Sequence, residues 1–142
     1  MEPAAVRFDT KIAVVLRAGL ATWQELNVTA FLASGVAAAF PEAMGEDYAD
    51  ADGTKYLPLL GQPVLVYSAG TVEEMARTLE RALSRDVRPA VFTADMFATG
   101  DDAANRAVVA AVAQRDLDLV GVALRGPRNA VDKITKGLSL HA

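Results

Sequence analysis

An uninterrupted apolar run near the start of the chain constrains its fold more than any other feature. Residues 12–16 read IAVVL, and the run ends at Arg17. A short run in which the residues of both strand faces are apolar is typical of a strand that is buried on both faces. A break at Ala18 and Gly19 follows, and a long helical pattern then continues to Pro41. The stretch predicts an interior strand and the first helix of a βαβ unit.

Strand and helix patterns alternate along the rest of the chain. Strands are predicted at residues 62–69, 90–93 and 117–124, and residues 138–140 suggest a further edge strand. This order predicts one α/β domain over residues 1–142, with an arm at 1–10, a core at 11–140 and helices that cover a sheet. The residues expected to start the four helices are Thr22 or Asn27, then Thr71, then Asp101 or Asp102, and finally Asn129.

Apolar residues at strand and helix spacing define the expected core. The third helix is expected to turn an apolar side inward. The residues on that side are Ala104, Ala107, Val108, Ala111 and Val112. The other residues predicted to lie in the core are Val64, Val66, Leu79, Val91, Val120, Val122 and Ile134.

Composition excludes several classes of function. The chain has no cysteine and a single histidine, His141, which argues against a Ser-His-Asp triad and against thiolate or histidine-rich metal sites. No dinucleotide fingerprint or Walker motif is present, so we expect no cofactor and no metal. No apolar run reaches the ~20 residues that span a bilayer and no secretory signal is visible, so we expect a cytoplasmic protein. The net charge of −4 argues against nucleic-acid binding.

Two charged residues follow predicted strands. Arg17 ends the first strand, and Asp95 comes after the strand at 90–93. Ligands in α/β sheets favour the carboxyl ends of strands, and helix N-termini attract anions. Arg17 is therefore a candidate for binding a carboxylate or phosphate, and Asp95 is a candidate catalytic base. The alternatives are a surface arginine, a loop-capping aspartate, or an ion pair between the two.

Two polar residues share one side of the first helix. Asn27 and Ser34 are seven residues apart, with Phe31 between them. Their amide and hydroxyl are candidates for contacting a polar ligand, and the alternative for Ser34 is a hydrogen bond to its own helix backbone. We expect Asn27 to lie near the helix start, where it would meet Arg17 and Asp95 at one rim of the sheet.

The segment at residues 42–60 is polar and rich in turns. Asp52 and Gly53 are typical of a tight hairpin. A loop this long in a small domain is often functional, and we interpret it as a lid over the rim. The alternating Asp47, Asp50 and Asp52 are interpreted as a solvated turn, because the closing glutamate of a calcium-binding loop is absent.

Two segments resemble the peptidyl-tRNA hydrolase type 2 family. The segment KIAVVLR from Lys11, followed by NVTA from Asn27, is similar to the family's opening, and LVGVA from Leu119 with VDKITKGLSL from Val131 is similar to its closing part. The resemblance spans most of residues 11–140. The chain as a whole also resembles an uncharacterised bacterial family of unknown function on this fold. The resemblance implies a three-layer αβα sandwich around a mixed, mainly four-stranded sheet, and a homodimer.

The same resemblance implies altered chemistry. Where the hydrolases carry a lysine, a glutamine and a histidine, this chain has Asn27, Phe31 and Ser34. Arg17 matches the family, and Asp95 lies near its loop aspartate. The change to Asn27 removes the cation expected to meet the RNA or the ester, so we expect no useful peptidyl-tRNA hydrolysis.

Three functions remain open at this point. The first is a module that binds a small polar or anionic ligand, or regulates through one, without the family's hydrolase chemistry. The second is a hydrolase, either a residual peptidyl-tRNA hydrolase or one that cleaves another ester or amide around Asp95. The third is a structural or partner-binding homodimer that uses the alanine-rich side of the first helix.

Overall fold

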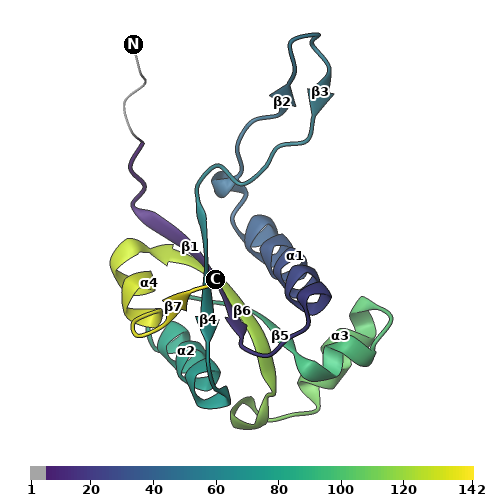
Figure 1. The fold of residues 1–142 in the computed structure, drawn as a ribbon, viewed down its shortest axis with the longest axis vertical. Helices are drawn as coiled ribbons and strands as arrows, with labels where there is room; N and C mark the ends of the chain where they lie inside the picture. Colours follow the sequence, from purple (N-terminus) through teal and green to yellow (C-terminus); the bar gives the residue numbers. More distant parts are fainter. Residues whose placement is uncertain (1–5) are drawn as a thin grey trace.

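A mixed five-stranded sheet lies at the centre of the computed structural model, which describes residues 6–142 (Figure 1). Its order is β5-β6-β1-β4-β7, and β1 runs parallel to β4 and antiparallel to β6. The interior position predicted for the first strand is therefore confirmed. The strands are β1 (Thr10–Arg17), β4 (Val64–Ala69), β5 (Ala90–Thr93), β6 (Leu119–Pro127) and β7 (Ser139–Leu140).

The main sheet has five strands rather than the four implied by the resemblance, and the fifth is the edge strand that the sequence suggested at residues 138–140. The additional strand is β7, whose Ser139 and Leu140 pair with Ser68 and Tyr67 of β4. A strand of two residues carries no periodic pattern, so the sequence suggested it only weakly.

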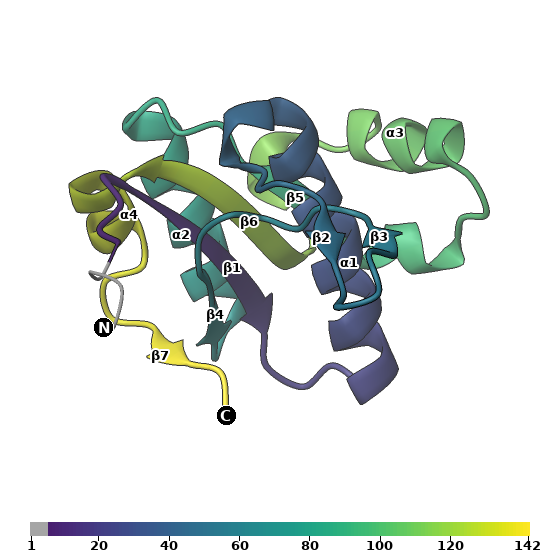
Figure 2. The same cartoon turned by 90° about the horizontal axis from the view of Figure 1, so that it is seen from above.

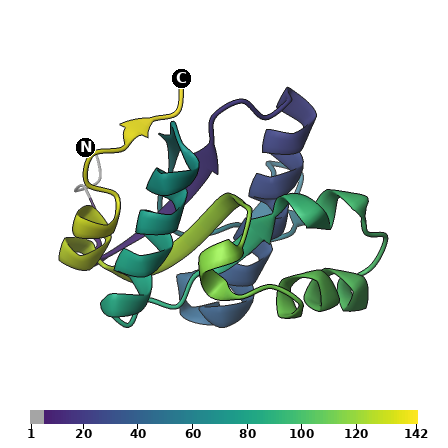
Figure 3. The same cartoon turned by 90° about the horizontal axis from the view of Figure 1, so that it is seen from below.

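The residues of β1 alternate between two apolar clusters, one on each face of the sheet. Ala13 and Val15 face α2 (Val72–Ser84) and α4 (Arg128–Ile134), with Met75, Leu79 and Ile134 among the helix residues in that cluster. Ile12, Val14 and Leu16 face α1 (Thr22–Ala39), which contributes Val28, Leu32 and Val36. Figure 3 shows the strands between α2 on one side and α1 on the other. Period-two alternation explains why a strand in the middle layer must be apolar throughout.

Most of the expected core residues lie in these clusters. Val120, Val122, Leu79 and Ile134 are buried, and Val66 and Val91 are half-buried. Val64 is a correction, because its side chain is 36% exposed. It is the first residue of β4, and β7 pairs only with the later residues Tyr67 and Ser68.

The helix starts agree with the sequence where a side chain caps the backbone. The Thr71 hydroxyl accepts from the N–H of Glu74 at 3.1 Å, and the Glu74 carboxylate accepts from the N–H of Gly70 at 2.8 Å. The Asp101 carboxylate likewise accepts from the N–H of Ala104 at 2.7 Å. Both caps were predicted.

Two helix starts are corrected. Ala21, rather than Thr22 or Asn27, is the residue before α1, and the Gln24 side chain accepts from its N–H at 2.9 Å. Asn27 therefore lies inside the helix. Pro127 rather than Asn129 precedes α4, and its backbone is extended with φ −52° and ψ 139°.

The third predicted helix does not cover the sheet. α3 (Asp102–Ala110) has no buried residue and stands beyond the border strand β5 (Figure 2). The expected inward side, including Ala107 and Ala111, is exposed or only half-buried. The reason is that α1, Phe92 and Phe97 already cover that part of the sheet, so no open face remains for α3.

A hairpin arm projects from the body between α1 and β4 (Figure 1). Its strands are β2 (Tyr48–Ala49) and β3 (Lys55–Tyr56), and Gly53 has a φ of 84°, which confirms the predicted hairpin. Asp50 holds the turn: its carboxylate accepts from the N–H groups of Asp52 and Thr54 and from the Tyr56 hydroxyl. The Tyr56 bond and the backbone bonds lower the pKa of Asp50, and the Asp50 carboxylate raises the pKa of Tyr56.

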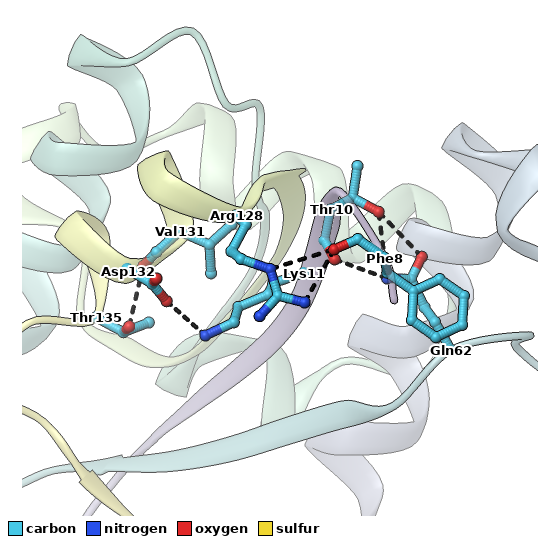
Figure 4. Close-up of polar contacts among 8 residues, drawn as sticks. All are labelled: Phe8, Thr10, Lys11, Gln62, Arg128, Val131, Asp132 and Thr135. Atoms are coloured by element: carbon cyan, nitrogen blue, oxygen red, sulfur yellow. Dashed lines mark hydrogen bonds and ion pairs between the residues drawn. The ribbon is translucent and has the colours of Figure 1, made fainter. Parts of the chain in front are cut away.

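The beginning of β1 is tied to α4 by polar contacts (Figure 4). The Lys11 ammonium lies 2.5 Å from the Asp132 carboxylate, and the Arg128 guanidinium donates two hydrogen bonds to the Phe8 carbonyl at 2.9 and 3.2 Å. Gln62 hydrogen-bonds to Thr10 on the other side of the strand. The contacts of Asp132 and Arg128 hold α4 against the sheet.

Within residues 6–142, no helix is both long and apolar enough to cross a membrane.

Substitution of Gly121 tests the packing of β6 against α1. A Cβ atom at this position would lie 2.6 Å from Val28 Cγ1 and 2.9 Å from Leu32 Cδ1. Gly121→Ala is therefore expected to lower the free energy of unfolding by about 1–3 kcal/mol, measured by urea denaturation. Gly100→Ala is the control, since nothing lies within 4 Å of its Cβ, and its effect should stay within about 0.5 kcal/mol. Equal effects of the two substitutions would contradict the packing described.

Candidate functional site

An apolar groove of about 830 Å³ lies between α1 and α3, beside the border strand β5. α1 forms one wall, and residues of α3 such as Asn105 and Val109 form the other. Ala90, Val91 and Phe92 of β5 lie at the bottom, together with residues of the short 3-10 helix η2 (Ala94–Ala98). The groove exists because α3 stands away from the sheet. Its size falls within the range of small-molecule sites.

Aromatic rings line the groove near the start of α1. Trp23 packs edge-on against Phe97 with ring centroids 5.9 Å apart, and Phe31 packs edge-on against Phe92 at 6.0 Å. Phe92 and Phe97 are 5.1 Å apart, which links the two pairs. Trp23 remains 61% exposed and Phe31 53% exposed. Large aromatic side chains that stay this open are a surface able to bind an apolar or planar group.

Polar groups on α1 lie among these rings. Asn27 and Ser34 both line the groove, so the structure brings these two candidates together. The Ser34 hydroxyl donates to the Phe31 carbonyl at 2.5 Å, which is the helix-backbone bond named as its alternative. The exposed Asn27 amide has no hydrogen-bond partner in the described part of the chain. Asn27 is therefore the polar group on α1 that is open to a ligand.

The polar groups on the opposite wall are mostly engaged with one another. Thr99 and Asn105 are hydrogen-bonded through their side chains, and Arg106 pairs with Asp102. Asp101 caps the N-terminus of α3, and its carboxylate forms no ion pair within residues 6–142. This end of the groove therefore carries net negative charge.

Arg17 and Asp95 lie outside the groove. The Arg17 guanidinium lies 2.5 Å from the carboxylate of Asp118, which directly precedes β6. β6 runs antiparallel to β1, so its amino end meets the carboxyl end of β1 at one rim. Asp95 is exposed on η2, two strands away in the sheet. The structure thus groups Asn27 with Ser34 and separates both from Arg17 and Asp95.

A second hollow of about 620 Å³ continues the groove along α1. Gly35 and Ala90 line both, and the second hollow extends to Phe40, Arg88 and Pro89. Gly35 is needed here for close approach, because a Cβ on it would lie 3.2 Å from the Cβ of Ala90. The two hollows together make an elongated depression along β5.

Sequence reasoning missed the aromatic part of the site. Trp23, Asn27 and Phe31 are spaced four residues apart, which places them on one side of a helix. That signal was available, but it does not say whether the side is buried. Phe92 and Phe97 carry no signal of their own, since their approach to α1 depends on the packing of β5 and η2.

No group of three histidine or acidic side chains is placed to hold a metal ion within residues 6–142. The Ser34 hydroxyl donates to its own helix backbone, and Asp95 does not line the groove. The carboxylates that do line the groove belong to Asp101, which caps α3, and to Asp102, which pairs with Arg106.

Residues 10–142 match the family described as Protein of unknown function (DUF2000). The chain belongs to the DUF2000 family. A solved structure of Atu0240, a protein of unknown function from Agrobacterium tumefaciens strain C58, is 49% identical, with a TM-score of 0.92. The match covers 96% of this chain and all of that one. No curated protein matches this DUF2000 chain.

The partner of Arg17 can be tested by a double-mutant cycle. Arg17→Gln and Asp118→Asn are expected to show a coupling energy of about 0.2–1 kcal/mol in urea denaturation, because the pair is partly solvated. The coupling should shrink at high salt. The control cycle joins Arg17→Gln with Asp95→Asn and should show no coupling. Coupling to Asp95 in place of Asp118 would show that the assigned ion pair is wrong.

Proposed function

We propose that this protein is a small-ligand-binding module and that the groove between α1 and α3 is its site. The observation that carries the proposal is the set of exposed aromatic rings in the groove around the Asn27 amide, which has no hydrogen-bond partner within residues 6–142. Apolar pockets with a few convergent polar groups are the usual form of ligand sites. Trp23 and Phe31 supply the apolar surface, and Asn27 supplies the hydrogen bonds.

The ligand that this site fits has an apolar or planar body and a polar group that can exchange hydrogen bonds with an amide. The Asn27 side chain both donates and accepts. The acidic end of the groove near Asp101 disfavours an anionic ligand at that position. Arg17 pairs with Asp118, so in this proposal it does not bind the ligand.

A relation to the peptidyl-tRNA hydrolase type 2 fold is part of the same proposal. Support comes from the sequence resemblance and from the mixed order β5-β6-β1-β4 between helical layers. Hydrolysis is the less favoured alternative, because Asn27 and Ser34 replace the hydrolase lysine and histidine. Neither residue is paired with a catalytic base in the described geometry.

Trp23 is the sole tryptophan of the chain, so its fluorescence reports directly on the groove. We expect a panel of aromatic amides to contain binders that shift the Trp23 emission. Phe31→Ala should weaken these binders about tenfold, which corresponds to about 1.4 kcal/mol of lost aromatic contact. Asn27→Ala should weaken the amides more than their analogues without the amide group.

Leu26→Ala is the matched control for Phe31→Ala. Leu26 is also on α1 and is 69% exposed, but it does not line the groove. Its replacement should change the affinity less than twofold. A panel without binders, or equal losses for Leu26→Ala and Phe31→Ala, would reject the groove as the site.

Self-association is a second candidate function, and the hairpin arm favours it. Tyr48, Tyr56, Leu57 and Leu59 on the arm are between 52% and 83% exposed. Residues 42–61 carry five acidic residues and one lysine, whereas the rest of the chain carries equal numbers of both signs. The arm therefore suits contacts with cationic side chains, and in this proposal they are exposed arginines at α2 of a second copy.

The two candidate arginines are Arg77 of α2 and Arg85 directly after it, beside the exposed Glu73 and Glu80 of the same helix. Arg77 and Arg85 are exposed and form no ion pair within residues 6–142. In this second proposal, the apolar side chains of the arm supply contact area and the charges supply orientation.

Analytical ultracentrifugation tests the second proposal. The protein is expected to sediment as a homodimer at 50 mM salt and to shift toward monomer at 500 mM, because salt screens the complementary charges. The pair Leu57→Ser and Leu59→Ser should give a monomer at both concentrations. Thr54→Ser, also on the arm, should leave the dimer unchanged. A monomer at low salt would exclude this role for the arm.

A further inference from the structure

We infer that the ligand class of the groove is an extended peptide segment, which adds as a strand to the free edge of β5. This inference rests on the proposed function and names the chemistry of its ligand. β5 is the border strand of the sheet and pairs only with β6. A border strand offers unpaired backbone donors and acceptors to any chain that lies beside it in extended form.

The direction in which each backbone N–H and C=O of β5 points follows from the hydrogen bonds between neighbouring strands of the sheet. The N–H of Ala18, directly after β1, donates to Ala69 of β4 at 2.8 Å. The N–H and C=O groups of successive residues in a strand point alternately to one neighbouring strand and to the other. Ala18 points to β4, so Val15, three residues earlier, points to β6, where Val15 pairs with Val122. The groups of the next residue of β6, Ala123, then point to β5, where Ala90 is the partner.

One residue further, Val91 directs its N–H and C=O away from β6 and toward the groove. Phe92, which faces Gly121, points back to β6. The next outward N–H is that of Thr93, which meets the sulfur of Met96 at 3.3 Å instead of a strand. Val91 lines the groove, and neither of its backbone groups has a side-chain partner or a partner in a loop or helix within residues 6–142. The N–H and C=O of Val91 are therefore available to hydrogen-bond with one residue of an added strand.

The shape of the depression fits an extended chain better than a round ligand. The groove and the second hollow share Gly35 and Ala90 and run together along β5. Four residues of β5 span about 13 Å at 3.3 Å per residue. α3, on the far side, is not packed against β5 and leaves the room that a strand about 4.8 Å away requires.

The two ends of the depression carry opposite charge. Asp101 lies at the end near the start of α3, and Arg88 lies at the other end, just before β5. Arg88 is exposed and forms no ion pair in the described residues. The complementary peptide carries a basic residue toward Asp101, an acidic residue toward Arg88, and an aromatic side chain between them for the rings near Phe31.

Selection from a random octapeptide display library tests the inference. Enriched peptides are expected to place a basic residue and an acidic residue at opposite ends around an aromatic residue. Val91→Pro removes the outward N–H but leaves the bonds of β5 to β6, as proline does on edge strands. It should weaken the enriched peptides about tenfold, whereas Val91→Thr, which keeps the N–H, should change binding less than twofold.

A second measurement leaves the protein unaltered, in case Val91→Pro disturbs the fold. Methylating the backbone nitrogens of an enriched peptide one at a time should abolish binding at alternate positions only, because an added strand directs every second residue to β5. Peptide binding that tolerates every methylation, or that is unchanged by Val91→Pro in a folded protein, would overturn strand addition.

The aromatic amide panel separates this inference from the proposed function. If the aromatic amides bind and no peptide is enriched, the groove remains a small-ligand site and the inference of a peptide ligand is refuted. Absence of both kinds of binder refutes both proposals. Enriched peptides that bind without competing with the amides place the peptide outside the groove and also refute the inference.

Discussion

The burial of β1 on both faces places this strand in the middle layer of the fold and thereby positions the helices around it. Ile12, Val14 and Leu16 pack against α1, while Ala13 and Val15 pack against α2 and α4. Each residue of this strand removes apolar surface from water on one face or the other. The strand therefore has to lie in the middle layer, with a strand on each side and helices on both faces. The ion pair between Lys11 and Asp132 then holds α4 against the beginning of β1.

The groove results from the way in which the helices and aromatic rings cover the sheet. α1 and the rings of Phe92 and Phe97 cover the sheet as far as its border. α3 finds no open face, remains without a buried residue, and stands apart from β5. The same arrangement leaves the border of the sheet unpaired and exposes Trp23 and Phe31. The candidate site thus arises where the three-layer packing ends, which is where backbone groups and aromatic surface remain available.

The elements that could be predicted from the sequence are those with a local physical signal. The apolar run of β1, the cap at Thr71 and the turn at Gly53 all depend on residues close together in the chain. The errors came where the outcome depends on distant residues. Val64 looks like any strand valine, but β7 pairs with β4 only beyond it. The apolar side of α3 was predicted to be buried, but α1 already covers that part of the sheet.

The α/β class, the interior strand and the helix side shared by Asn27, Phe31 and Ser34 follow from local periodicity, because helix and strand periodicity are set by neighbouring residues. The contacts that those residues make depend on the packing of the whole chain. Arg17 pairs with Asp118, rather than with Asp95, because β6 lies beside β1 and begins at its carboxyl end. The order of strands in a sheet arises from the packing of the whole chain, so the residues joined across a rim or a groove are known only from the completed fold.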